Sequence, residues 1–151
     1  MQKIIAKAIT HGVYVITTQV EGKKNGMTAA WVSQVSFKPP LVMASIAPAR
    51  YTHDLIKSAG YFAINTLKED QIELAKHFGF KSGRNTDKMA DVEYFEGQYG
   101  SPILKEALAY IECKVVNIFE AGDHTIFVGE VVDGKVLREG KQLLFVWERF
   151  F

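Results

Sequence analysis

The segment PARYTHDLI, residues 48–56, carries residue types that suit the binding of a phosphate group. The start of a helix presents free backbone N–H groups and a partial positive charge, and both favour an anion. Arg50 adds a forked cation that matches phosphate oxygens, and Thr52 adds a hydroxyl that can cap the helix. The spacing is equally compatible with an ordinary surface arginine beside a threonine helix cap.

A second candidate lies just upstream, where an expected strand carries small residues in place of bulky ones. Ala29 and Ala30 allow a flat ligand to approach the backbone, whose N–H and C=O groups can then bond the edge of that ligand. The hydroxyls of Thr28 and Ser45 could add further contacts. Close packing against a neighbouring helix would explain the same small residues without any ligand.

The third candidate is His124, in the stretch AGDHTIF. It follows a turn and leads into a strand, where it could contact a ligand at the mouth of a barrel. A solvated histidine with a local hydrogen bond is the alternative. The single cysteine, Cys113, gives no thiolate cluster, and the four histidines lack the spacing of a metal site. Redox or group-transfer chemistry would therefore require a bound organic cofactor.

Short strands dominate the elements that must position these candidates. Alternation and β-branched content predict early strands over residues 12–20, 27–37, 41–47 and 61–67. Two short helices are expected, one from Thr52 to a stop at Gly60 and one over residues 69–79. Residues 80–102 show little pattern and are expected to form a mobile surface loop.

The chain becomes β again after residue 110, with turns expected at EAGDH, residues 120–124, and at Asp133–Gly134. A last strand is expected in LLFVWERFF, residues 143–151. There is no strand–helix alternation of the kind that builds a parallel sheet. The sequence therefore predicts a mainly β protein, an antiparallel barrel with a few short peripheral helices.

Composition limits the class of protein further. The 151 residues suit one domain, and hydrophobic residues make up 48% of them, which indicates a globular chain. A formal net charge of +1 argues against a dedicated nucleic-acid binder. No apolar run is long enough to span a membrane, and the N-terminus does not read as a signal peptide. One cysteine fits a reducing compartment, so a cytoplasmic location is expected.

Taken together, these motifs resemble the flavin reductase-like, FMN-binding split-barrel family, and most closely its flavoredoxin-type branch. That branch includes flavin reductase domains fused to rubredoxin or to diflavin proteins. The most specific matches are PPLV after the small-residue strand and GDH-x-IF-x-GEV near the end. The others are GVYVITT, NGMTAAWVSQVSF, RYTHDLI, FAINTL, LAKHFG and SPILKEALAYIECKV. In order, these stretches cover nearly the whole chain.

The resemblance implies an FMN-binding split barrel over residues 1–151, forming a homodimer with FMN near the subunit interface. Family members transfer hydride from NADH or NADPH to the flavin. Electrons then pass to free flavin, to a protein partner or to ferric iron. No nucleic acid, membrane or metal is implied.

The family's site residues can be carried over by position. Most of them would form a wall for the isoalloxazine ring, and the others would hold the phosphate or act near the reacting edge. The wall would consist of Met27, Thr28, Ala29, Ala30, Trp31, Ser45, Ile46 and Ala47. The phosphate would be held by Arg50, Tyr51 and Thr52. The catalytic residue would be His124. Two positions depart from the family: Ala30 stands where relatives often have Ser or Asn, and Trp31 narrows the expected nicotinamide site.

Two other functions remain open on the sequence. One is an FMN electron carrier, reduced by a rubredoxin- or ferredoxin-type partner in place of NAD(P)H; the bulk of Trp31 favours it. The other is a non-redox module that uses the same barrel to hold a haem or another flavin-like ligand.

Overall fold

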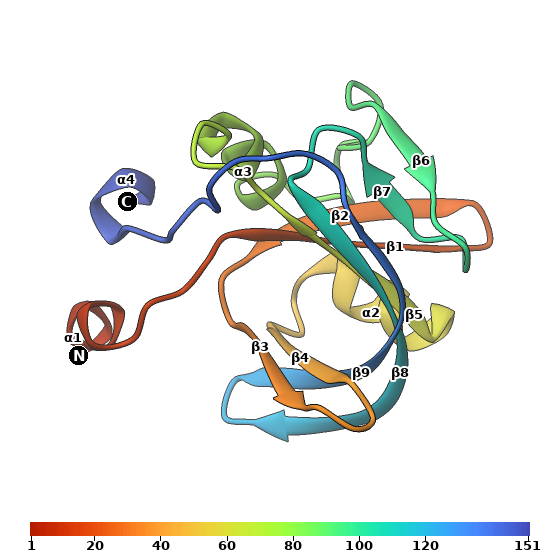
Figure 1. Cartoon of the computed structure of the whole chain (residues 1–151), viewed down its shortest axis with the longest axis horizontal. Helices are drawn as coiled ribbons and strands as arrows, with labels where there is room; N and C mark the ends of the chain where they lie inside the picture. The colour runs from red at the N-terminus through yellow and green to blue at the C-terminus, as the bar shows by residue number, and fades with distance from the viewer.

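A computed structural model describes all 151 residues and contains nine strands and four short helices (Figure 1). The helices are α1 (Gln2–Ala8), α2 (Tyr51–Ala59), α3 (Ile72–Gly79) and α4 (Trp147–Phe150). The strands are β1 (Tyr14–Val20), β2 (Lys23–Ala29), β3 (Val32–Ser36), β4 (Leu41–Ile46), β5 (Tyr61–Thr66), β6 (Tyr94–Glu96), β7 (Pro102–Leu104), β8 (Ala109–Ala121) and β9 (His124–Val136). No helix has both the length and the apolar content needed to cross a bilayer.

Seven strands form one antiparallel sheet in the order β2-β1-β5-β8-β9-β4-β3. Its two edge strands, β2 and β3, are consecutive in sequence, so the chain crosses from one edge of the sheet to the other at residues 30 and 31. The backbone N–H of Ser45 donates to the carbonyl of Trp31 at 3.0 Å and fixes this crossing on β4. The result is an antiparallel split barrel with small peripheral helices, which confirms the predicted fold class.

The prediction of one strand over residues 27–37 was wrong, and the crossing explains why. β2 pairs with β1 only as far as Ala29, which lies opposite Tyr14 at the start of β1. Beyond that point β2 has no partner, and the chain leaves it to begin β3 beside β4. The strand break therefore falls inside the small-residue segment, so the backbone of Ala30 is not part of a ladder.

Other differences concern the second half of the chain. Asp133 and Gly134 do not form a turn but lie within β9, opposite Glu112 and Ile111 of β8. The end of the chain is not a strand: it makes an isolated bridge at Leu144 and then the short helix α4. The region 80–102 is not a plain loop, because it contains β6, which pairs with β7, and the buried residues Lys88 and Met89.

Two apolar layers hold the site in place. The barrel interior is filled from β1, β2, β4, β5, β8 and β9, and α2 adds Ile56 to it. On the other face of β1, Val15 packs with Ala75 and Phe78 of α3. Gly26 of β2 allows Phe78 to pack this close to the sheet, since a Cβ at residue 26 would lie 3.0 Å from the Phe78 ring. The start of α2 and the end of α3 are thereby both held against β2.

Candidate functional site

A cavity of about 360 Å³ lies at the crossing between β2 and β3. Its walls include most of the residues predicted from the sequence: Met27, Thr28, Ala29, Ala30, Trp31, Ser45, Ala47, Arg50 and His124. The remaining lining comes from the two ends of the chain, through Gln2 of α1 and the aromatic residues Phe145, Trp147 and Phe151. We call this space the ring cavity. Figure 1 shows α1 and α4 on the same side of the barrel.

The small residues open a second, narrower space beside the ring cavity. Thr28, Ala29, Ala30 and Arg50 also line this space of about 180 Å³, which is otherwise bounded by α3 and aromatic side chains near the C-terminus. The Thr28 hydroxyl donates to the carbonyl of Ala75 in α3, so it anchors β2 to that helix. Thr28 therefore lines both spaces, but its hydroxyl proton is already donated to α3.

Three predicted residues do not line the ring cavity. Tyr51 lines a neighbouring space, described below. Ile46 is fully buried in the barrel core. Thr52 is also fully buried, and its hydroxyl accepts a hydrogen bond of 2.8 Å from Nδ2 of Asn25. The expectation that Thr52 caps the helix was wrong, because Arg50 occupies the cap position and makes no side-chain cap bond.

Arg50 connects the ring cavity to a third space of about 250 Å³, which we call the phosphate pocket. Its lining includes Arg50, Tyr51, Lys81, Ser82, Gly83 and Lys88. Nζ of Lys88 donates to the carbonyls of Phe78 and Lys81, both at 3.0 Å. Nη2 of Arg50 lies 3.4 Å from the Phe78 carbonyl. Neither cation has a carboxylate partner among the ion pairs of the structure.

Several backbone N–H groups at or next to this pocket are free. The N–H groups of Tyr51 and Thr52, at the start of α2, have no protein acceptor, and neither do those of Lys81, Ser82 and Gly83. Successive free N–H groups of this kind form an anion-binding concavity, and a helix N-terminus reinforces it. Gly83 is needed for the close approach, because a Cβ there would collide with the side-chain oxygen of Asn25.

The electrostatics of the pocket favour an added anion. Burial, together with the charge of nearby Arg50, lowers the pKa of Lys88 to about 8. Burial likewise lowers the pKa of Arg50. An anion between the two groups would offset their repulsion and their lost hydration.

The sequence did not reveal the contribution of residues 81–88. The glycine and cations of the stretch KSGRN, within residues 80–102, predict a mobile surface loop. The same composition could have indicated an anion-binding turn, had its position beside α2 been known.

His124 lines the ring cavity but not the phosphate pocket. Its ring centroid is 4.6 Å from that of Trp31, with the two planes tilted by 48°. Nδ1 of His124 lies 2.8 Å from a carboxylate oxygen of Asp123, and this contact lowers the pKa of the Asp123 carboxyl. The histidine thus has an aromatic neighbour and a carboxylate contact that can hold it in place at the cavity wall.

Comparison with known proteins identifies relatives over almost the whole chain. The family model described as "Flavin reductase like domain" matches residues 6–151. The ferric-chelate reductase (NAD(P)H) of Archaeoglobus fulgidus is 35% identical over 139 residues, which cover 91% of this chain and 82% of that protein. The high molecular weight rubredoxin of Moorella thermoacetica is 36% identical over 141 residues, but this chain spans only 62% of its length.

Among solved structures, an FMN-binding protein from Thermus thermophilus with bound 1-cyclohex-2-enone superposes with a TM-score of 0.87. It is 30% identical, and the match covers 93% of this chain and 84% of that one. Sequence and structure comparisons therefore point to the same group of proteins.

Proposed function

Because this chain belongs to the flavin reductase-like domain family, we propose that it is an FMN-binding oxidoreductase that takes hydride from NADH or NADPH. The observation that carries the proposal is the role of Arg50, which lines the ring cavity, the narrow space beside it and the phosphate pocket. A wall for a flat ring is thereby continuous with a pocket for a phosphate, and FMN combines these two groups.

Different residues of the site would contact the ring and the phosphate of FMN. The isoalloxazine ring would lie against the backbone of Ala29 and Ala30, where no bulky side chain intervenes. The phosphate would accept from Arg50, from Lys88 and from the free N–H groups of residues 51–52 and 81–83. Bound FMN supplies the hydride acceptor, which no side chain of the chain can provide.

His124 is assigned to the reacting edge of the ring cavity. Its contact with Asp123 at 2.8 Å orients the imidazole, which could hydrogen-bond a ligand at that edge. Trp31 lies against it, with the two rings tilted, and would limit the room for a second ring. The side chains at this end are therefore proposed to orient ligands.

Reduction by nicotinamides tests the proposal directly. The purified protein loaded with FMN is expected to be yellow and to bleach anaerobically on addition of one equivalent of NADH or NADPH. Absorbance near the flavin maximum measures the extent of reduction. An FMN-loaded protein that resists both donors would contradict the assignment.

One observation favours a second function, an electron carrier reduced by another protein. Trp31 is 37% exposed and lies against His124, so it occupies space that a nicotinamide ring would need. Relatives joined to a rubredoxin, such as the Moorella protein, are consistent with a protein partner. Fast reduction by a reduced rubredoxin or ferredoxin, with slow reduction by both nicotinamides, would select this function. The final acceptor would then be a partner protein, in place of free flavin or ferric iron.

The exposed apolar residues support a homodimer. Phe37 of the β3–β4 connection is 90% exposed, and Val35, Val116 and Phe119 on β3 and β8 are 53%, 48% and 47% exposed. No residue of α1 is buried. Large apolar side chains that gather at the surface can mark a protein interface. Sedimentation equilibrium is expected to give twice the chain mass of 16.9 kDa. The double variant Phe37→Ser with Phe119→Ser is expected to lower the measured mass. A wild-type protein that sediments as a monomer would rule the dimer out.

A further inference from the structure

Asp54, in the first turn of α2, contacts two side chains at once. One carboxylate oxygen lies 3.1 Å from Nδ1 of His53, and the other accepts from Nη2 of Arg84 at 3.3 Å. The hydrogen bond from His53, and then that from Arg84, lowers the pKa of the Asp54 carboxyl. None of the three residues lines the ring cavity or the phosphate pocket. Any effect they have on a ligand there must therefore pass through other groups.

The surroundings of His53 fix the orientation of its ring. The residue is only 6% exposed, and the ring packs edge-on against the buried Phe127, with the centroids 5.2 Å apart. Nε2 lies 2.8 Å from the hydroxyl of Thr125, which is also buried. A carboxylate can only accept, so Nδ1 donates to Asp54, and the Thr125 hydroxyl can then donate to Nε2. One oxygen of Asp54 is thus held by a buried side chain, which leaves the other for Arg84.

The loop that carries Arg84 is a turn with hydrogen bonds of its own. The carbonyl of Ser82 accepts from the N–H groups of Asn85 and Thr86, at 3.1 and 3.2 Å. The hydroxyl of Ser82 accepts from the N–H of Arg84 at 3.2 Å. These bonds hold the turn together as one unit. The direction of the free N–H groups of residues 81–83 therefore depends on how this unit is attached to the rest of the protein.

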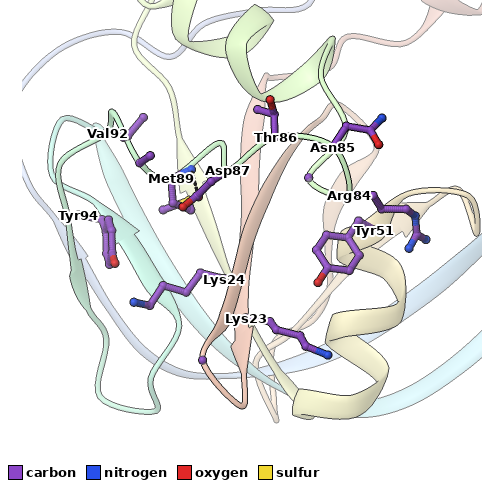
Figure 2. A pocket seen from close by; sticks show the side chains of 13 residues that line it. Lys23, Lys24, Tyr51, Arg84, Asn85, Thr86, Asp87, Met89, Val92 and Tyr94 are labelled. Atoms are coloured by element: carbon purple, nitrogen blue, oxygen red, sulfur yellow. Dashed lines mark hydrogen bonds between the residues drawn. The ribbon is translucent and has the colours of Figure 1, made fainter.

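Arg84 attaches the turn to the start of α2. Its guanidinium lies 5.1 Å from the centre of the Tyr51 ring, in addition to its contact with Asp54. Figure 2 shows Arg84 and Tyr51 beside each other at the wall of a groove of about 620 Å³. Tyr51 is the first residue of α2, and Gly83 directly precedes Arg84. The attachment therefore sets the two groups of free N–H donors, one from α2 and one from the turn, relative to each other at the phosphate pocket.

We infer that Asp54 is a positioning residue for the phosphate of FMN: held by His53, it fixes Arg84 and thereby orients the N–H groups of residues 81–83 toward the anion. This role rests on the proposed function, since it requires a flavin phosphate in the phosphate pocket. Asp54 does not touch that phosphate. Its negative charge opposes an anion, so the benefit of Asp54 lies in the placement of the donors.

An isolated ion pair at a protein surface contributes little, and the side chains of Asp54 and Arg84 are 61% and 45% exposed. This pair is not isolated, because His53 and Thr125 anchor it in the barrel at one end and Tyr51 adds a contact at the other. We therefore expect an effect of a few-fold on ligand affinity, carried by the position of one turn, and no loss of the fold.

The sign of the change in FMN affinity on Asp54→Asn tests this role. By charge alone, removal of a carboxylate near the pocket would strengthen the binding of a phosphate. Loss of positioning instead weakens it, and we expect the dissociation constant of FMN to rise about three- to fivefold. Riboflavin, which lacks the phosphate, should bind unchanged. Fluorescence titration with both ligands measures the two constants.

The matched control is Asp91→Asn. It removes an exposed carboxylate from the same part of the chain, and this carboxylate has no ion-pair partner. The affinities for FMN and riboflavin should both stay as in the wild type. Any general effect of lost negative charge would appear in this variant as well.

A double-mutant cycle shows whether Asp54 acts through Arg84. Arg84→Gln should weaken FMN by a factor similar to that of Asp54→Asn. The double variant should be no weaker than either single variant, because both substitutions remove the same contact. Thr125→Val removes the hydroxyl beside His53 and should weaken FMN in the same direction by a smaller factor. Unchanged riboflavin affinity shows that each variant is folded.

The other outcomes overturn distinct statements. Unchanged or stronger FMN binding in Asp54→Asn overturns the positioning role, and a loss in Arg84→Gln alone would show that Arg84 contacts the phosphate directly. Additive losses in the double variant, or equal losses of FMN and riboflavin, also overturn it. An unchanged FMN affinity in Thr125→Val removes His53 from the chain of contacts. A wild-type protein that binds no flavin overturns the proposed function itself.

Discussion

Replacing Arg50 with alanine is expected to weaken FMN by on the order of 1.5–3 kcal/mol, which is about ten- to a hundredfold in the dissociation constant, and to leave riboflavin unaffected. The guanidinium is the cation that borders both the ring cavity and the phosphate pocket, and it has no carboxylate partner. Only FMN has a phosphate for it to contact. Fluorescence titration with the two ligands measures the difference.

Two further variants make the Arg50 result specific. Arg50→Lys keeps the charge but loses the fork, so FMN affinity should fall between those of the wild type and Arg50→Ala. Arg149→Ala removes an exposed arginine of α4 and serves as the control. Equal losses of FMN and riboflavin in Arg50→Ala would instead show that Arg50 shapes the ring cavity, and would refute its role as a phosphate ligand.

Local chemistry in the sequence predicted much of the fold. The β-branched runs give strands, and Gly60 ends α2 with a positive φ of 76° that glycine adopts easily. The errors arose where long-range pairing decides the outcome. Residues 27–37 look like one strand, but β2 stops opposite the start of β1, and β3 needs a partner, β4, from further along the chain. Asp133–Gly134 has the composition of a turn, yet β8 continues opposite it.

The residues of the candidate site also fall into two groups, those that local sequence predicts and those that depend on tertiary contacts. Arg50 could be predicted because its neighbours in sequence form the helix start beside it. Lys88 could not, because its amine reaches the carbonyl of Phe78 across a segment without periodicity. Thr52 was assigned a ligand contact on its residue type, while in the structure Asn25, distant in sequence, uses that hydroxyl. Residue type identified candidate donors, and tertiary contacts decided which of them remain free.

The affinity for FMN is expected to fall as the pH rises above about 8, through the titration of Lys88. In the ligand-free protein, burial and Arg50 lower the pKa of this amine to about 8. A phosphate dianion favours the charged amine, so binding raises its pKa. Below pH 8 the amine is already protonated, so FMN binding requires no uptake of a proton. Above pH 8 a proton must be taken up on binding, so the affinity falls by up to about tenfold per pH unit.

Riboflavin provides the control for this pH profile, because it shares every titration of the ring and lacks the phosphate. The ratio of FMN to riboflavin affinity, measured from pH 6.5 to 9.5, should decline above about pH 8. Lys88→Met should lower that ratio at neutral pH and remove the decline, while riboflavin affinity reports whether the loop of residues 81–88 is still in place. A ratio that is independent of pH in the wild type would mean that the phosphate does not meet Lys88. The pocket would then bind its anion through Arg50 and the backbone N–H groups alone.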